Sequence, residues 1–114
     1  MIVRNIEQDL VAKRWYVAHG GARATMLFAG GELGGLLFFA HAELKPGKKL
    51  EEHLDTYEEI YYFLKGTGLM KVGSDTQQVK PGDAAWLPYG IPHSLLNNGT
   101  EDCIFVVAAA EPAD

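Results

Sequence analysis

The chain has 114 residues and a net charge of −5 at pH 7, and 47% of its residues are hydrophobic. This length suits one domain, and the apolar content is high enough for a packed core and excludes a disordered chain. The acidic balance and scattered basic residues argue against a nucleic-acid partner. No apolar run is long enough for a membrane span, and the N-terminus shows no signal peptide. We expect one domain over residues 1–114 with no membrane partner.

The chain contains one cysteine, Cys103. A single cysteine forms no internal disulfide, so nothing indicates an oxidising compartment, and we expect a cytoplasmic protein. No neighbour of Cys103 suggests a lowered thiol pKa, and we predict an inert thiol in the core.

The predicted elements are mostly short strands. Residues 7–17 are ambiguous between helix and strand, with an extended finish because Trp15-Tyr16-Val17 is aromatic and β-branched. Asn98-Gly99 predicts a hairpin turn between the last two strands. The strands are expected at 22–29, 36–44, 50–55, 59–65, 69–72, 76–80, 84–87, 93–97 and 103–110.

This spacing of strands and turns decides the fold class. Short strands with turns every eight to twelve residues or so indicate an all-β sandwich or barrel. No capped helical pattern of comparable length competes with them. The sequence therefore predicts an all-β jelly roll.

Four side chains in the middle of the chain are of types that bind a divalent metal through nitrogen and oxygen: His53, Asp55, Glu59 and His93. His53 and Asp55 are two residues apart, so on an extended strand they point the same way. Strand alternation places Glu59 on the same face as Tyr61. A carboxylate that faces inward is costly unless it is paired or coordinated, which favours Glu59 as a ligand.

The spacing from Gly47 to Gly66 resembles the first motif of the cupin superfamily, with His53, Asp55 and Glu59 at its ligand positions. In that motif the position of Asp55 is usually a second histidine. Asp55 is either a direct ligand or too short to reach the metal, with water in the gap. We favour direct binding, because two carboxylates beside two neutral imidazoles balance a divalent cation.

The second half of the pattern lies between Gly82 and Asn97. Pro88, Gly90 and His93 stand between these ends, and this spacing resembles the second cupin motif at every fixed position. The resemblance is to small single-domain cupins of the conserved-barrel type. It implies a double-stranded β-helix (jelly-roll) barrel, with motif 1 at 47–66 and motif 2 at 82–97.

The resemblance also implies a cofactor. It implies a divalent ion held by His53, Asp55, Glu59 and His93, and oxygen-rich ligation favours Fe²⁺ or Mn²⁺, with Zn²⁺ or Ni²⁺ as alternatives. His53, Asp55 and His93 also resemble the triad of oxoglutarate-dependent iron oxygenases. We reject that alternative, because those enzymes need a basic residue beyond the distal histidine and none follows Lys80.

Three functions stay open at this point. The first is a small metalloenzyme of dioxygenase, isomerase or lyase type that acts on a small molecule in the barrel. The second is a module that binds a small ligand or a metal without catalysis, and the third is a metal-free interaction protein. In the enzyme, Asp55 and Tyr61 are the candidate catalytic residues, and the candidate pocket walls are Phe38, His41, Tyr61, Trp86 and Tyr89.

The last strand suggests self-association. Ile104-Phe105-Val106-Val107 is apolar on both faces and needs cover, and small cupins often pair through terminal strands. We therefore expect a homodimer.

Overall fold

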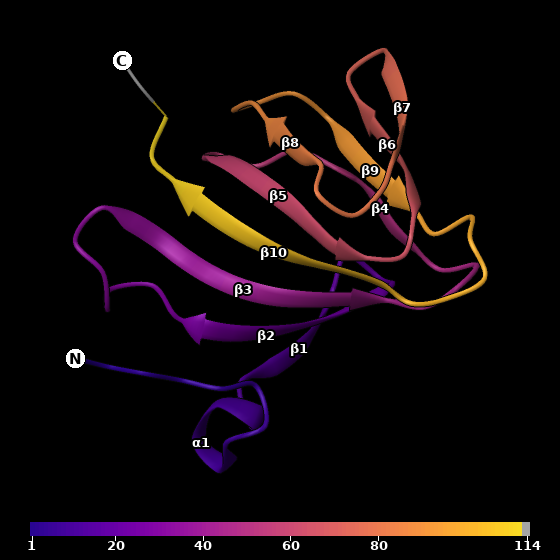
Figure 1. Ribbon diagram of the computed structural model, residues 1–114. Helices are drawn as coiled ribbons and strands as arrows, with labels where there is room; N and C mark the ends of the chain where they lie inside the picture. Colours follow the sequence, from indigo (N-terminus) through magenta and orange to yellow (C-terminus); the bar gives the residue numbers. More distant parts are fainter. Residues whose placement is uncertain (113–114) are drawn as a thin grey trace.

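The computed structural model describes residues 1–112 and consists of two antiparallel sheets with one short helix, α1 (Asp9–Ala12). The larger sheet has the order β1-β2-β3-β10-β5-β8, and the smaller has the order β4-β9-β6-β7 (Figure 1). The strands of the larger sheet are β1 (Trp15–Ala18), β2 (Ala22–Phe28), β3 (Leu36–Leu44), β10 (Cys103–Ala110), β5 (Glu58–Lys65) and β8 (Ala84–Leu87). Those of the smaller sheet are β4 (Lys49–His53), β9 (His93–Leu96), β6 (Gly68–Val72) and β7 (Asp75–Val79).

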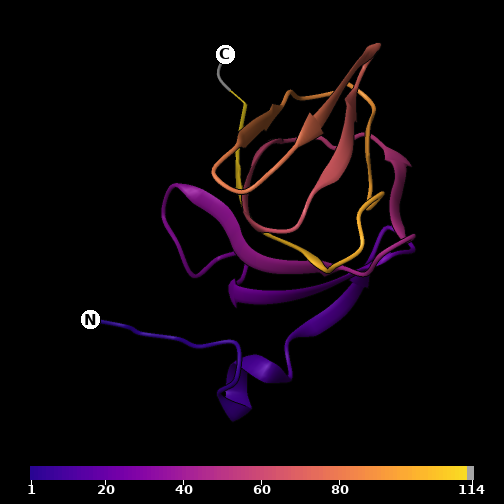
Figure 2. The same ribbon diagram turned by 45° about the vertical axis from the view of Figure 1, so that its right-hand side comes forward.

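The two sheets face each other across one core, and Figure 2 shows the strands curving around this common interior. Alternation along the strands sorts the side chains: in β10 the residues from Cys103 to Ala109 are buried at every second position. Phe63 of β5 packs against Phe105 of β10, with ring centroids 5.4 Å apart. Each such fully buried large side chain stabilises the fold by about 1.5–3 kcal/mol. The all-β prediction is confirmed, and the arrangement is consistent with a double-stranded β-helix.

The ambiguous segment 7–17 resolves into both predicted alternatives. One helical turn, α1, precedes the extended β1, and Val11 anchors that turn because it is fully buried. The helix lies beside β2 at the lower end of the molecule in Figure 1, away from β4 and β9. None of the described residues forms a helix long and apolar enough to cross a membrane.

Two sequence predictions about local geometry were wrong. β4 ends at His53, so Asp55 lies in the connection to β5 rather than on the strand. Asn98-Gly99 is not a hairpin turn, because β9 belongs to the smaller sheet and β10 to the larger one. The chain crosses between sheets there, and a local turn signal carries no information about which strands pair.

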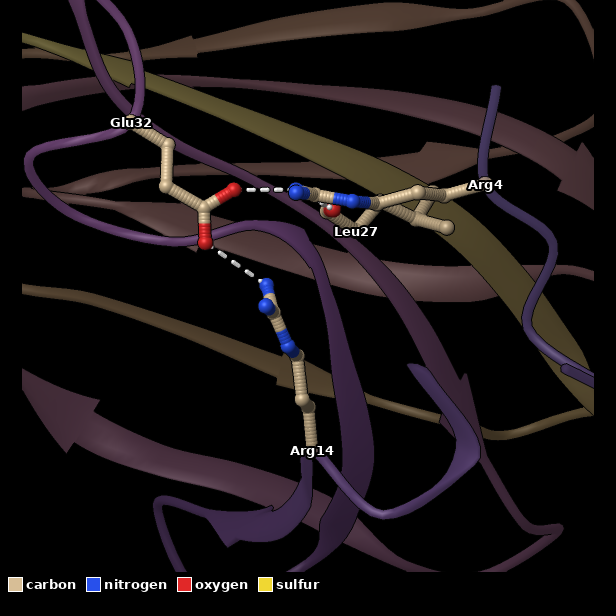
Figure 3. Close-up of polar contacts among 4 residues, drawn as sticks. All are labelled: Arg4, Arg14, Leu27 and Glu32. Atoms are coloured by element: carbon tan, nitrogen blue, oxygen red, sulfur yellow. Dashed lines mark hydrogen bonds and ion pairs between the residues drawn. The ribbon is translucent and has the colours of Figure 1, made fainter. Parts of the chain in front are cut away.

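Arginines fix the N-terminal segment to the larger sheet (Figure 3). Arg4 and Arg14 both pair with the carboxylate of Glu32, which lies between β2 and β3, and the Arg14 Nη1 to Glu32 Oε1 distance is 2.8 Å. Arg4 Nη1 also donates to the carbonyl of Leu27 at 2.9 Å. These contacts lower the pKa of Glu32, chiefly through its hydrogen bond with Arg4. Exposed ion pairs of this kind position a segment more than they stabilise a fold.

Candidate metal centre

Paired backbone positions bring the two predicted histidine ligands together. His53 on β4 and His93 on β9 are direct register partners, and their ring centroids lie 4.2 Å apart. Glu59 reaches the same point from β5 in the opposite sheet, with only 6% of its surface exposed. Asp55 completes the group from the connection that follows β4. We call these four residues the donor cluster.

The distances within the donor cluster suit one small cation. One ligand atom from each residue lies within 4.8 Å of all the others. Asp55 Oδ2 is 3.5 Å from His53 Nε2 and 3.6 Å from His93 Nε2, and Glu59 Oε1 is 3.6 Å from His93 Nε2. Ligand atoms that each lie about 2.0–2.2 Å from one ion are separated by roughly 3–4.4 Å, so small adjustments bring all four into its coordination sphere.

The donor atoms of the cluster are buried and lack partners. Among the described residues, His53 Nε2, Asp55 Oδ2, Glu59 Oε1 and both ring nitrogens of His93 have no hydrogen-bond partner. Buried polar atoms are almost always satisfied, and leaving several unsatisfied in one place is costly. A divalent ion would satisfy all of those that converge, so the residues present fit a metal.

Backbone contacts orient the imidazole of His53. Its Nδ1 lies 2.7 Å from the carbonyl oxygen of Glu51, and a carbonyl only accepts, so Nδ1 carries the proton. Nε2 is then left with its lone pair directed to the donor cluster. This arrangement, in which the second ring nitrogen bonds a backbone carbonyl, is typical of histidines that bind metals.

A model of the cupin domain matches residues 40–109, which is more than half of the chain. The chain belongs to the cupin family. The matched region includes all four residues of the donor cluster and the strands β4 to β9 that carry or connect them.

Two curated proteins are similar to part of this chain. The cupin is 42% identical over 62 residues to an uncharacterized protein of Methanocaldococcus jannaschii, covering 53% of this chain and 49% of that one. It is 35% identical over 69 residues to a protein of Thermotoga maritima named oxalate-binding protein, covering 60% and 57%. The match thus spans about half the length of these curated relatives.

A solved structure shows the same fold over nearly the whole chain. It is described as a predicted oxalate decarboxylase from Thermotoga maritima, with a TM-score of 0.76 and 24% identity. The alignment covers 97% of this cupin and 99% of that chain. At 24% identity this similarity shows a shared fold and does not show a shared reaction.

Burial and neighbouring ionisable groups shift the pKa values of Glu59 and His93 in this cupin site. Burial, and then the neighbouring Asp55 carboxyl, raise the pKa of Glu59 to about 8. Burial, and then the adjacent His53, lower the pKa of His93 to about 4. At neutral pH the site therefore holds a neutral His93 and a largely protonated Glu59, and a bound cation would reverse the second of these.

A cavity of about 50 Å³ adjoins the donor cluster, with Glu59 in its wall. Ordered water needs roughly 10–15 Å³ on this measure, so the cavity holds about three to five waters or a ligand of similar size. Alanines of β2 and β3 create the space because they project so little. The lining consists of Tyr16, Ala18, His19, Ala22, Ala24, Phe38, Ala40, Ala42, Leu50, Tyr57, Glu59, Tyr61, Phe105 and Val107.

The structure separates the predicted pocket residues into two groups. Phe38 and Tyr61 line this cavity, and the Tyr61 ring lies 6.3 Å from that of His93. His41, Trp86 and Tyr89 do not line it, and Trp86 and Tyr89 are 61% and 57% exposed. Trp86 faces outward because its neighbour Leu87 takes the buried position of β8.

Sequence reasoning missed three polar residues of the cavity: Tyr16, His19 and Tyr57. Tyr57 lies two residues from both Asp55 and Glu59, so its place within the first motif was an available signal. Tyr16 and His19 come from β1 and the turn after it, and no local pattern links that region to the motifs. Burial is the first cause that raises the pKa of Tyr16 and of Tyr57, so their phenols are protonated at neutral pH.

Two further residues have structural roles. Asn97 is fully buried and its amide nitrogen donates to the carbonyls of Leu44 and Glu101 at 2.8 Å. Its side-chain oxygen accepts from the Gly99 N–H at 2.9 Å, so Asn97 bonds three backbone groups. Cys103 is buried, and burial raises the pKa of its thiol to about 11, which agrees with an inert core residue.

Proposed function

We propose that this chain is a small metal-dependent cupin enzyme of dioxygenase, isomerase or lyase type. It holds Fe²⁺ or Mn²⁺ through the donor cluster and acts on a small molecule in the adjoining cavity. The observation that carries the proposal is the convergence of four side chains whose buried donor atoms have no other partner among the described residues. Zn²⁺ and Ni²⁺ are the alternative metals.

A bound divalent ion would supply Lewis-acid chemistry or, for iron, a place to bind oxygen. The chain's own residues would orient the substrate and move protons. Tyr61 is buried at the cavity wall and its pKa is raised well above the ordinary value, first by burial and then by Glu59. Its phenol therefore donates a hydrogen bond to a substrate oxygen, whereas Asp55 serves as fourth ligand or as a base beside the ion.

Metal content tests the first half of this proposal. We expect about one equivalent of Fe²⁺ or Mn²⁺ per chain after loading and gel filtration, measured by elemental analysis. Glu59→Gln and His93→Ala should each lower metal affinity at least about tenfold. Glu58→Gln is the matched control, because Glu58 is the adjacent carboxylate on β5 and lies outside the donor cluster. Equal metal content in Glu59→Gln and Glu58→Gln would contradict the proposed ligand set.

A non-catalytic module is the alternative function, and the small size of the cavity favours it. Turnover decides between the two. The Fe²⁺- and Mn²⁺-loaded proteins would be incubated with small carbonyl, phenolic and carboxylate compounds, with oxygen uptake and product formation recorded. Product formation that Tyr61→Phe reduces would support the enzyme, and ligand binding without any turnover would support the module.

We also propose a cytoplasmic homodimer. The surface predicted for pairing, residues 104–107, lies on β10, which pairs with β3 on one side and β5 on the other and so has no free edge. Exposed apolar side chains lie instead along the outer face of β5 and β8: Ile60, Tyr62, Leu64 and Trp86. A second copy that covers them would remove this apolar surface from water. Light scattering after gel filtration should give twice the chain mass of 12.5 kDa for the wild type and the single mass for Trp86→Glu. A single mass for the wild type would refute the dimer.

A further inference from the structure

We infer that this cupin site takes a small uncharged oxygen compound, such as a hydroxy ketone, an enol or a diamide, and discriminates against dicarboxylate dianions. The inference rests on the proposed function, since it assumes a divalent ion in the donor cluster. It goes further by assigning the charge of the ligand. It also separates this chain from the curated relative whose printed name is oxalate-binding protein.

Asp55 sets the charge balance of the site. Asp55 and Glu59 contribute two negative charges to the donor cluster, and neutral His53 and His93 contribute none. A divalent ion therefore brings the site to a formal charge of zero. A histidine at position 55, as the usual motif has it, would leave the same site at +1. A dianion would therefore bind to a neutral site in this chain, but to a site of charge +1 if position 55 were histidine.

The cavity offers no cation to compensate a dianion. No lysine or arginine is among the described residues that line it. Among the described lining residues, His19 is the one group besides the donor cluster that could carry positive charge, and its ring is stacked on that of His53 with centroids 3.3 Å apart. Several basic groups pair elsewhere: Arg4 and Arg14 with Glu32 (Figure 3), Arg23 with the Trp15 ring, Lys45 with Asp102, and Lys71 with Glu52.

The lining instead suits uncharged oxygens. The phenols of Tyr16, Tyr57 and Tyr61 donate or accept hydrogen bonds without charge, and the rest of the wall is mostly alanine and aromatic carbon. Burying an uncompensated charge in such surroundings is far more costly than burying a hydrogen-bonded carbonyl or hydroxyl. A neutral site with apolar walls and a few phenols therefore selects against a second pair of carboxylates.

Three isosteric compounds isolate charge from shape: oxalate (−2), oxamate (−1) and oxamide (0). Their binding to Mn²⁺-loaded protein at pH 8 would be measured by calorimetry, with elemental analysis afterwards to show that the metal is retained. We define the oxalate preference as the dissociation constant of oxamide divided by that of oxalate. We expect a preference at least about tenfold lower in the wild type than for Mn²⁺ free in water, with oxamate intermediate.

Substitution of Asp55 should reverse the effect. Asp55→Asn keeps the shape and removes the charge, and Asp55→His restores the usual motif; each should raise the oxalate preference about tenfold over the wild type. Asp75→Asn removes an exposed carboxylate on β7 and should leave the preference unchanged. If neither Asp55 variant retains Mn²⁺, the inference is tested by the oxalate preference of the wild type compared with that of free Mn²⁺.

The possible results distinguish failure of the proposed metal site from failure of the proposed charge selectivity. A wild type that retains neither Mn²⁺ nor Fe²⁺ after loading refutes the proposed function itself, and if Fe²⁺ alone is retained the three compounds are compared on the Fe²⁺-loaded protein. A wild type that retains Mn²⁺ but prefers oxalate as strongly as the free ion does, or whose preference is unchanged by loss of the Asp55 charge, overturns this inference and leaves the metal site standing. Mn²⁺-loaded protein that binds none of the three compounds also overturns it, because the cavity is then not a ligand site.

Discussion

The imidazole of His19 stacks on that of His53, with ring centroids 3.3 Å apart and ring planes 9° apart. The same two residues are joined through the backbone of Glu51, whose N–H donates to the His19 carbonyl at 3.0 Å and whose carbonyl accepts from His53 Nδ1 at 2.7 Å. His19 adopts a left-handed conformation, with φ of 47°, in the turn between β1 and β2. The turn of the larger sheet therefore braces a proposed metal ligand of the smaller sheet.

His19→Ala should weaken metal binding without abolishing it. The stack is worth about 0.5–1.5 kcal/mol, so we expect roughly a two- to tenfold loss of Co²⁺ affinity, measured by titration of the absorption spectrum. His41→Ala is the matched control, because the β3 alternation buries Ala40 and Ala42 and turns His41 away from the cavity. Unchanged Co²⁺ affinity and spectrum in His19→Ala would show that the stack has no part in positioning His53.

Metal binding at pH 7 should release close to one proton. Glu59 has a pKa of about 8 in the metal-free protein and must lose its proton to coordinate, whereas His93, with a pKa of about 4, is already neutral. Apparent metal affinity should rise with pH up to about 8 and then level off. Calorimetry in buffers of different ionisation enthalpy measures the release, and a binding heat that is the same in all buffers would contradict it.

The directions of the Glu59 and His93 pKa shifts also determine how the stability of the protein without metal depends on pH. The folded-state pKa of Glu59 is raised from 4.5, so its contribution to stability is lost as pH rises toward 8. The folded-state pKa of His93 is lowered from 6.5, so stability is lost as pH falls toward 4. Between pH 6.5 and 8 the first effect dominates, so Tm should fall as the pH is raised, and saturating metal should remove the fall.

Asn97→Ala should destabilise the fold. The substitution removes three hydrogen bonds to backbone groups and leaves the Leu44 carbonyl without its bond from Asn97, at a cost of about 2–4 kcal/mol in the free energy of unfolding. Asn98→Ala is the adjacent control, because among residues 1–112 the Asn98 side chain bonds only the exposed Gln78 and its loss should change stability by less than about 0.5 kcal/mol. Urea unfolding of both variants measures the difference, and similar midpoints would refute the role given to Asn97.

The two glycines of the first motif should differ in their tolerance of alanine. Gly47 and Gly66 both have positive φ, 78° and 74°. A Cβ at Gly47 meets nothing within 4 Å, whereas one at Gly66 would lie 2.3 Å from the carbonyl oxygen of Asp102. Gly47→Ala should therefore cost about 1–2 kcal/mol for its backbone conformation alone. Gly66→Ala should cost clearly more, and equal unfolding midpoints would show that the backbone near Asp102 yields freely.

The motif residues and most strands could be predicted from the sequence because their signals are local. The bounds of β3, β8 and β10 match the predicted ranges, and alternation correctly placed Glu59 on the inner face of β5. The four proposed ligands were found because their spacing is a property of the chain itself. The structure adds that they meet.

The remaining features depend on contacts between distant segments. Nothing in the sequence near Asn98 tells that β10 pairs with β3 and β5 instead of β9. The same holds for His19, whose place beside His53 follows from the packing of one sheet on the other. Trp86 was predicted to line the pocket because it sits just before the loop of the second motif, but a strand of four residues carries too little pattern to say which face is buried.

The direct register pairing of His53 with His93 has a consequence for how such a site can diversify. The two imidazoles are set by the ladder between β4 and β9, so their spacing withstands changes in surrounding side chains. Asp55 stands beyond the end of β4, where backbone hydrogen bonds constrain the chain less. A substitution at position 55 can therefore change the net charge of the site while the nitrogen donors stay in place. Position 55 is thus a place where evolution can change ligand selectivity in a single step.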